Sequence, residues 1–215
     1  MQYVERMKKD NTAALLEFAL SVKGYLTENE GLRLFELALE AANLGPCLEI
    51  GSFCGKSTVY LGAACQWKGT TLFTIDHHHG SEEQQPSQLY FDPEIYDKKA
   101  GHIDSLPSLR TTLENSGLED TVVPMITTSR AAAKSWSIPL SLVFIDGGHS
   151  YNCVLTDYQC WSRHLIKGGY LVFHDIYLDP TQGGQAPYEV YKLALDSGIY
   201  IELPLSGSLG ILRRI

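Results

Sequence analysis

From residue 46 onward, short runs of apolar residues alternate with longer segments in which apolar residues recur every three or four positions. The short runs are rich in β-branched and aromatic residues, which is typical of strands buried on both faces of a parallel sheet. The longer segments have the period of amphipathic helices. This alternation favours a doubly wound, Rossmann-like α/β fold. Strands are predicted over residues 47–51, 71–76, 122–127, 141–146 and 170–174, and helices over 57–67, 103–116, 129–136 and 151–166.

The two ends of the chain extend this pattern. Residues 1–44 are predicted to form two helices, the second of which begins with a capping box made by Thr27 and Glu30. A helix over 188–195 is followed by strands over 200–205 and 208–212, which only Ser206 and Gly207 separate. So short a connection indicates an antiparallel hairpin. We therefore expect residues 1–215 to form a single domain: a mostly parallel seven-stranded sheet, a C-terminal antiparallel hairpin and an N-terminal helical extension.

Residues 77–102 form the longest segment without a periodic pattern, and they are rich in Gly, Pro, Gln, Tyr and acidic residues. A long irregular segment inside a compact domain is usually functional or mobile. This one follows the second predicted strand, at the edge of the sheet where doubly wound folds bind ligands. It is therefore predicted to be an active-site loop, and residues 178–186 form a second flexible segment at the same edge.

Composition narrows the function classes. The 215 residues carry a formal net charge of −8, so the chain offers no basic face for nucleic acid. No apolar run approaches the roughly twenty residues that span a bilayer, and residues 1–10 lack the apolar core of a signal peptide. Five irregularly spaced cysteines indicate free thiols in a reducing compartment. These features predict a cytoplasmic protein that binds neither nucleic acid nor membranes.

A glycine-punctuated turn follows the first predicted strand, with the sequence Glu49-Ile50-Gly51-Ser52-Phe53-Cys54-Gly55-Lys56-Ser57. A strand, turn and helix in this order bring backbone close to a ligand and aim a helix N-terminus at it. A dinucleotide fold would need a second glycine where Phe53 stands. A P-loop would need four residues between Gly51 and the Gly-Lys-Ser sequence, and only three are present. The third ligand considered is S-adenosylmethionine (SAM), which carries no phosphate.

The next strands also end in polar groups. Asp76 is placed to accept hydrogen bonds from both hydroxyls of a ribose, and His77 beside it to lie against the nucleoside. Ser129 follows the third strand, where it is predicted to cap the next helix and to meet the adenine. These positions fit an adenosine-bearing cofactor lying across the edge of the sheet.

Asp146 ends the fourth strand, and His174 and Asp175 end the fifth. Two carboxylates about 5 Å apart repel by roughly 3 kcal/mol at an effective dielectric near 20. A divalent cation would relieve this repulsion, and the mixed oxygen and nitrogen donors suit Mg, Mn or a later transition metal. The alternative is one carboxyl with a raised pKa and no metal. His149 lies three residues after Asp146 and is the candidate general base, because the unperturbed pKa of a histidine, about 6.5, suits that role at neutral pH.

Taken together, the glycine turn, Asp76, the run from Asp146 to Tyr151 and the His174–Asp175 pair resemble class I SAM-dependent O-methyltransferases. The closer resemblance is to the metal-dependent branch, which includes catechol, caffeoyl-CoA, macrocin-type and cephalosporin-hydroxylase-like enzymes. It implies a cation held by Asp146, His174 and Asp175, with His149 where catechol-type enzymes carry a lysine base. His174 departs from that branch by replacing a carboxylate. The cofactor-binding residues expected from the resemblance and the turn are Glu49, Gly51, Ser52, Phe53, Gly55, Ser57, Asp76, His77, Ser129 and Asp146.

The predicted function is methyl transfer from SAM to a hydroxyl of a small molecule such as a catechol, a sugar or another natural product. A divalent cation is expected to assist, and a homodimer is also predicted. Two rival hypotheses remain at this point. One is a nucleotide-dependent phosphotransferase that uses Lys56, Ser57 and Thr58, and the other is a SAM-fold protein that binds without catalysis.

Overall fold

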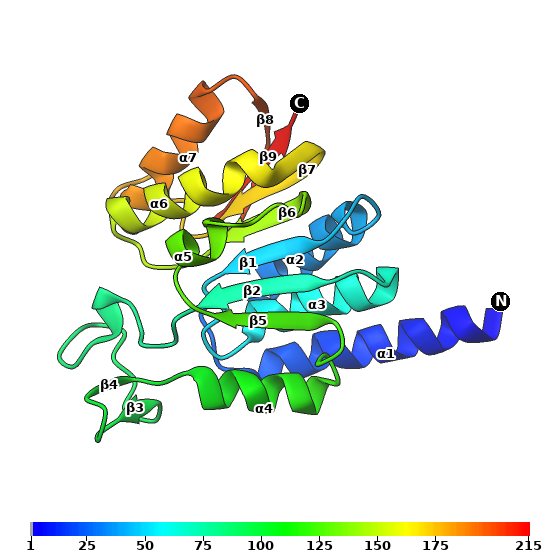
Figure 1. The fold of residues 1–215 in the computed structure, drawn as a ribbon, viewed down its shortest axis with the longest axis horizontal. Helices are drawn as coiled ribbons and strands as arrows, with labels where there is room; N and C mark the ends of the chain where they lie inside the picture. The colour runs from blue at the N-terminus through cyan, green and yellow to red at the C-terminus, as the bar shows by residue number, and fades with distance from the viewer. Residues whose placement is uncertain (1) are drawn as a thin grey trace.

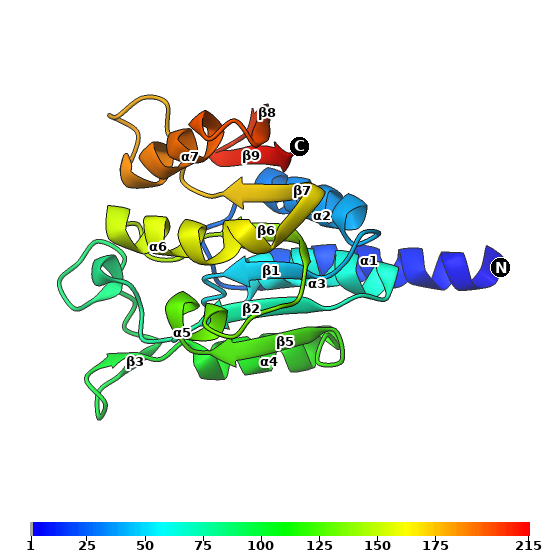
Figure 2. The ribbon, with the colours of Figure 1, turned by 45° about the horizontal axis from the view of Figure 1, so that its top comes forward.

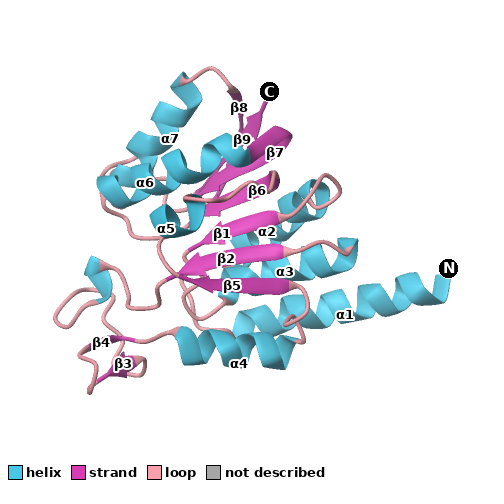
Figure 3. Cartoon of the chain, in the orientation of Figure 1, coloured by secondary structure: helices cyan, strands magenta, loops and turns pink. Residues whose placement is uncertain are grey.

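A computed structural model describes residues 2–215, with side chains from Asn11 onward. Its centre is a seven-stranded sheet in the order β5-β2-β1-β6-β7-β9-β8. The first five of these strands are parallel, and β9 runs antiparallel to both β7 and β8 (Figures 1 and 3). This confirms the predicted fold class and its C-terminal hairpin. The strands are β1 Cys47–Ile50, β2 Leu72–Asp76, β5 Val122–Ile126, β6 Leu140–Ile145, β7 Leu165–Phe173, β8 Tyr200–Ser206 and β9 Leu209–Arg214.

Helices cover both faces of the sheet and bury two separate apolar cores (Figure 2). One face packs against α1 Gln2–Ser21, α2 Glu28–Ala41, α3 Lys56–Lys68 and α4 Leu106–Ser116. The other packs against α5 Ser129–Ala133, α6 Tyr151–Trp161 and α7 Ala186–Asp196. Because strands β1 and β6 are buried along their whole length, their carboxyl ends are fixed positions from which polar side chains can project.

The N-terminal extension is helical as predicted, and the capping box of α2 is present with both of its hydrogen bonds. Several predicted boundaries were wrong. Helix α4 begins at Leu106 rather than at residue 103, because Pro107 lacks an N–H and fits only the first turn of a helix. Ile103 instead pairs with Tyr96 in a short strand.

The segment before the fifth parallel strand also differs from the prediction. Helix α6 ends at Trp161, a 3-10 turn follows over Ser162–His164, and β7 already begins at Leu165. Gly168 has a φ of +82°, which allows β7 to bulge between its pairings with Leu140 and Leu142. The apolar residues at 165 and 166 therefore continue the strand, not the helix.

The other differences are smaller. Helix α5 stops at Ala133, three residues early, and α7 starts two residues early with Pro187 in its first turn. Strand β8 includes Ser206, so the turn of the hairpin moves to Gly207 and Ser208.

Residues 77–102 extend from the carboxyl end of β2, away from the body of the sheet (Figure 1). They are not wholly irregular. A 3-10 turn covers Glu82–Gln84, and a two-stranded ribbon pairs β3 Tyr96–Asp97 with β4 His102–Ile103. The short elements give this loop fixed points from which its side chains reach the sheet edge. Across the described residues, we find no helix with the length and apolarity that crossing a membrane requires.

Candidate active site

The glycine turn between β1 and α3 packs closely against the carboxyl ends of β6 and β2. Gly51 has a φ of +90°, and a Cβ there would lie 2.0 Å from the backbone oxygen of Asp146. Glycine therefore lets the ends of β1 and β6 approach each other. Phe53 has a φ of +47°, and its backbone N–H donates to Asp76 Oδ2 at 2.9 Å. The turn and the β2 carboxylate are thus held together.

Glu49 lies at the end of β1 and is completely buried. Its Oε2 accepts hydrogen bonds from the hydroxyls of Thr58 and Thr74, at 2.6 Å and 2.7 Å. Burial raises its pKa to about 7, although hydrogen bonds from Ser57, Thr58 and Thr74 oppose that shift. Its other oxygen, Oε1, and the buried hydroxyl of Ser52 have no partner among the described residues. Buried polar atoms without partners are costly, so these two are suited to meeting a ligand.

The predicted nucleoside residues are placed as follows. The Asp76 carboxylate accepts from the backbone N–H of His78 at 2.7 Å, in addition to Phe53. His77 is exposed, and its Nδ1 accepts from the backbone N–H of His79 at 3.0 Å. Ser129 is buried and accepts a hydrogen bond from the Trp161 indole at 3.1 Å. The prediction that Ser129 caps α5 was wrong. The neighbouring Thr128 occupies the cap position, and its hydroxyl accepts a hydrogen bond from the backbone N–H of Ala131.

Four titratable side chains gather where β6 and β7 end. His174 Nδ1 lies 3.0 Å from Asp146 Oδ1 and 3.5 Å from Asp175 Oδ2. His149 Nε2 lies 3.0 Å from the same Asp175 oxygen. Asp175 has a φ of +58°, an uncommon conformation for a residue with a side chain, and such strain tends to occur at functional sites. The structure therefore brings together the four residues that the sequence placed at these strand ends.

The electrostatics of this cluster follow from carboxylates facing imidazoles. Burial lowers the pKa of His149, but Asp175, Asp146 and Glu83 outweigh burial and raise it to about 9. The pKa of His174 rises further for the same reason, with Asp146, Asp175 and Glu30 opposing its burial. Burial raises the pKa of Asp175, but the two imidazoles hold it well below its usual range. Both imidazoles therefore carry positive charge beside the paired carboxylates in the absence of an ion, and this charge relieves part of the repulsion for which a cation was predicted.

Three further residues contact this cluster, and the sequence did not assign them to it. The buried Glu30 lies 3.7 Å from His174 Nε2 and also accepts hydrogen bonds from the backbone and side chain of Ser208. Glu83, from the 77–102 loop, lies 2.9 Å from His149 Nδ1. The Tyr177 hydroxyl donates to Asp175 at 3.0 Å. The capping-box pattern at Glu30 was recognised, but it gave no sign of the contacts that the same carboxylate makes with distant residues.

Comparison with known proteins decides the family. A family model described as a methyltransferase domain matches residues 48–176, from β1 to just beyond β7. The chain belongs to this methyltransferase family. That confirms the enzyme class suggested by the glycine turn and the strand ends.

The solved structures similar to this methyltransferase share its fold at low sequence identity. The O-methyltransferase NovP is 13% identical, with a TM-score of 0.67 over 87% of this chain and 80% of that one. A putative caffeoyl-CoA O-methyltransferase from Staphylococcus aureus is 13% identical, with a TM-score of 0.63 over 100% and 98% of the two chains. An O-methyltransferase from Bacillus cereus in complex with SAH is 15% identical, with a TM-score of 0.63 over 95% and 91%.

One curated sequence relative is the uncharacterized protein R132 of Acanthamoeba polyphaga mimivirus. It is 37% identical over 57 residues, which span 26% of this chain and 25% of that protein. The match thus covers about a quarter of each protein.

Lys56 of the methyltransferase does not serve the glycine turn as a P-loop lysine would. It is the first residue of α3, and a Cβ at Gly24 would lie 2.8 Å from its Cβ and 3.2 Å from its Cδ. The aliphatic stem therefore packs against the connection between α1 and α2. This direction favours the methyltransferase over the phosphotransferase hypothesis.

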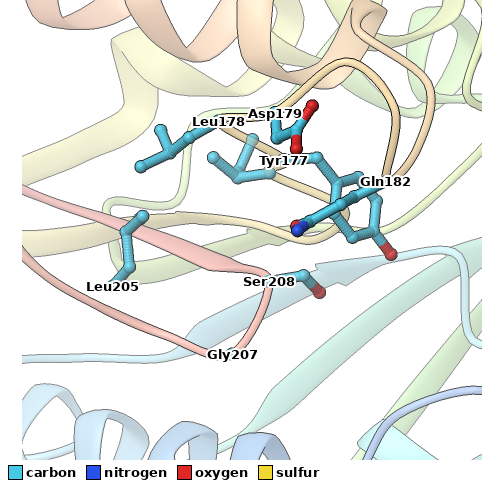
Figure 4. Close-up of a pocket in the computed structure, with 8 residues that line it drawn as sticks. Tyr177, Leu178, Asp179, Gln182, Leu205, Gly207 and Ser208 are labelled. Carbon is cyan, nitrogen blue, oxygen red and sulfur yellow. The ribbon is translucent and has the colours of Figure 1, made fainter.

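A cavity of about 370 Å³ lies beside the titratable cluster (Figure 4). The segment after β7 forms one wall and the β8–β9 turn the other. Two lining residues connect the cavity to the cluster. Tyr177 donates a hydrogen bond to Asp175, and Ser208 donates to Glu30, which lies 3.7 Å from His174 Nε2. Its size is within the range of small-molecule sites. The lining residues are Ile176, Tyr177, Leu178, Asp179, Gln182, Leu205, Gly207 and Ser208.

Proposed function

We propose that this methyltransferase transfers the methyl group of SAM to a hydroxyl of a small molecule. One observation carries the proposal: a cluster of two carboxylates and two imidazoles adjoins the glycine turn of a methyltransferase fold. The similar solved structures support it, since those named above are O-methyltransferases and one is a complex with SAH.

The cofactor is proposed to lie across the carboxyl edge of β1, β2, β5 and β6. Glu49, Gly51, Ser52, Phe53, Gly55 and Ser57 would surround its amino-acid part, and the unpartnered atoms of Glu49 and Ser52 support this placement. Asp76 and His77 would meet the ribose, Ser129 the adenine, and Asp146 the end near the reacting methyl group. The ionised Glu49 carboxylate would pair with a cofactor that carries an ammonium and a sulfonium, and a pKa of about 7 leaves this form accessible at neutral pH.

His149 is proposed to be the general base. The acceptor oxygen forms a bond to the methyl carbon as the carbon–sulfur bond breaks, so that S-adenosylhomocysteine (SAH) leaves with the bonding electrons. The hydroxyl proton passes to the neutral form of His149, whose population grows as the pH rises toward its pKa of about 9. The neighbouring carboxylates of Asp175 and Glu83 stabilise the resulting imidazolium. Holding oxygen, carbon and sulfur in line supplies much of the rate enhancement, because positioning replaces a bimolecular encounter.

The residues present fit a divalent cation. Among the described residues, Asp146, His149 and Asp175 offer ligand atoms that all lie within 4.8 Å of one another. His174 Nδ1 faces the same two carboxylates. We propose that Asp146 and Asp175 would hold the ion with His174 as the third ligand, and that the His174 ring would release its proton as the ion binds. This donor set suits Mn or a later transition metal as well as Mg. A bound cation would supply positive charge that lowers the pKa of the acceptor hydroxyl.

The cavity of Figure 4 is proposed to hold the body of the acceptor. Leu178 and Leu205 offer apolar contact, while Gln182, Asp179 and Ser208 offer hydrogen bonds at its edge. An acceptor with an apolar framework and several hydroxyls would match this lining. Whether it is a catechol, a sugar or another natural product is decided by the acceptor assay.

The test combines binding and turnover. Isothermal titration calorimetry is expected to show heat with SAM and none with ATP. Panels of hydroxyl acceptors incubated with SAM are expected to yield SAH and a product heavier by one methylene, read by mass spectrometry. Treatment with EDTA should reduce the rate, and one added divalent ion should restore it. Heat with ATP alone would overturn the proposal, whereas full activity in EDTA would remove only the cation.

We further infer a cytoplasmic location and a homodimer. The location is supported by the cysteines, all five of which are free. Size-exclusion chromatography with light scattering tests the homodimer directly.

A further inference from the structure

His149 is held from two sides by carboxylates that come from different parts of the chain. Its Nε2 faces Asp175 at 3.0 Å, and its Nδ1 faces Glu83 of the 77–102 loop at 2.9 Å. We propose that Glu83 is a positioning residue, which orients the imidazole of His149. This inference rests on the proposed function, because it assigns His149 the role of base.

The loop presents Glu83 from a well-braced turn. Ser81 and Gln84 form a capping box around the 3-10 turn, and the Gln85 amide donates to the backbone oxygens of Ser81 and His79. The backbone oxygen of Glu83 itself accepts from the N–H of Tyr90 at 3.1 Å. These bonds hold the backbone at Glu83 in place, so the side chain starts from a fixed position near His149.

The loop is also tied to the body of the protein near the cofactor turn. Lys23 pairs with Asp92 and with Glu94, each at 2.5 Å. Tyr25 packs against Phe53 of the glycine turn, with ring centroids 5.9 Å apart, and against Tyr90 of the loop at 5.3 Å. The contacts fasten the far part of the loop, so Glu83 approaches His149 from an anchored segment.

Asp175 alone is poorly suited to orient His149. Its Oδ2 is shared with His174 at 3.5 Å, and its Oδ1 accepts from Tyr177. In the proposed reaction the same carboxylate would also hold a cation. The contact between Nδ1 and Glu83 is independent of those demands, so it can hold the orientation of the ring whatever Asp175 binds. Bases in other enzymes are oriented by a third group in the same manner.

A matched pair of substitutions tests the role. Glu82 lies on the same turn and is exposed, so Glu82→Gln controls for the loss of one negative charge from the loop. With an acceptor found in the assay above, Glu83→Gln is expected to lower kcat by about tenfold or more, because a displaced base loses much of its contribution. The KM for SAM should stay within about twofold. Glu83→Asp should recover part of the rate, and Glu82→Gln should behave as wild type.

A second readout needs no acceptor. In protein labelled with ¹⁵N-histidine, the ring signals of His149 are assigned by their loss in His149→Gln. They are expected to shift in Glu83→Gln and to stay in place in Glu82→Gln. Unchanged signals, an unchanged kcat, or an equal effect of both glutamine variants would overturn the role of Glu83. Failure of the proposed function is distinguished from these results, because it shows itself as the absence of heat with SAM in the wild-type protein.

Discussion

Glu49 shows how a single residue links the stability of this methyltransferase to its cofactor. Its carboxyl is removed from water, and its pKa rises from 4.5 to about 7 because burial disfavours the charged form. A carboxyl whose pKa is higher in the folded state stabilises the fold when it is protonated. That stabilisation is fully present below pH 4.5 and is lost as the pH rises through 7. The shift corresponds to about 3 kcal/mol between the two extremes.

We expect Glu49→Gln to remove most of this pH dependence. Urea unfolding at pH 5 and pH 8 should show a free energy of unfolding that falls by up to about 3 kcal/mol more in wild type than in the variant. The variant should also bind SAM at least about tenfold more weakly, because its amide cannot pair with a cationic ligand. Glu17→Gln, at an exposed position of α1, is the control. Equal pH slopes in wild type and Glu49→Gln would contradict the assignment.

At the same scale, the cluster residues that end strands could be predicted from the sequence, whereas those that reach the cluster from distant segments could not. Asp146, His149, His174 and Asp175 were predictable because parallel strands end at one edge of a sheet. Glu83 is 66 positions from His149 in the chain, and no periodicity marks it. The contacts of Glu30 and Glu83 depend on the packing of whole segments, which a local pattern does not encode.

At the scale of elements, the two segments after β2 and β7 decide access to the candidate site. The segment after β7 folds back so that the Gln185 amide donates to the backbone oxygens of Tyr177 and Gly183. It thereby forms a wall of the cavity opposite the β8–β9 turn. The cavity thus depends on a hydrogen-bonded loop and a hairpin, neither of which belongs to the parallel core.

Filling this cavity is expected to affect the acceptor and not the cofactor. Leu205→Trp places a large ring against Leu178 and should raise the KM for the acceptor by about tenfold or more, while the affinity for SAM measured by calorimetry stays within about twofold. Ile201→Trp lies on the same strand at an exposed position and should leave both quantities unchanged. A loss of SAM affinity in Leu205→Trp would instead place the cavity at the cofactor.

Elements with a strong apolar run were predicted best. The parallel strands β1 and β6 are buried throughout, so their runs were unbroken and their positions came within one residue. The boundaries of α4 and β7 failed because a proline and a bulge, respectively, set them. The ribbon within residues 77–102 was not predicted, because two-residue strands carry no detectable period.

At the scale of the whole molecule, a ligand that binds only the folded state raises its stability. SAH at about a hundredfold excess over its Kd should add about 2.7 kcal/mol to the free energy of unfolding. For a protein of this size, each kcal/mol raises Tm by roughly 2–4 °C. Differential scanning fluorimetry should show this rise with SAH and no rise with ATP. A rise with ATP alone would revive the reading of Lys56 as a phosphate ligand.

The hydrogen bond between Glu30 and Ser208 determines how much of the chain must be included when the protein is expressed. The family match covers residues 48–176, yet this bond joins a helix that precedes the match to a hairpin that follows it, directly behind His174. Shortening the polypeptide to residues 48–176 would remove both Glu30 and Ser208, and water would then reach the imidazole of His174. Expression plasmids and fusion partners should therefore leave the residues on both flanks intact.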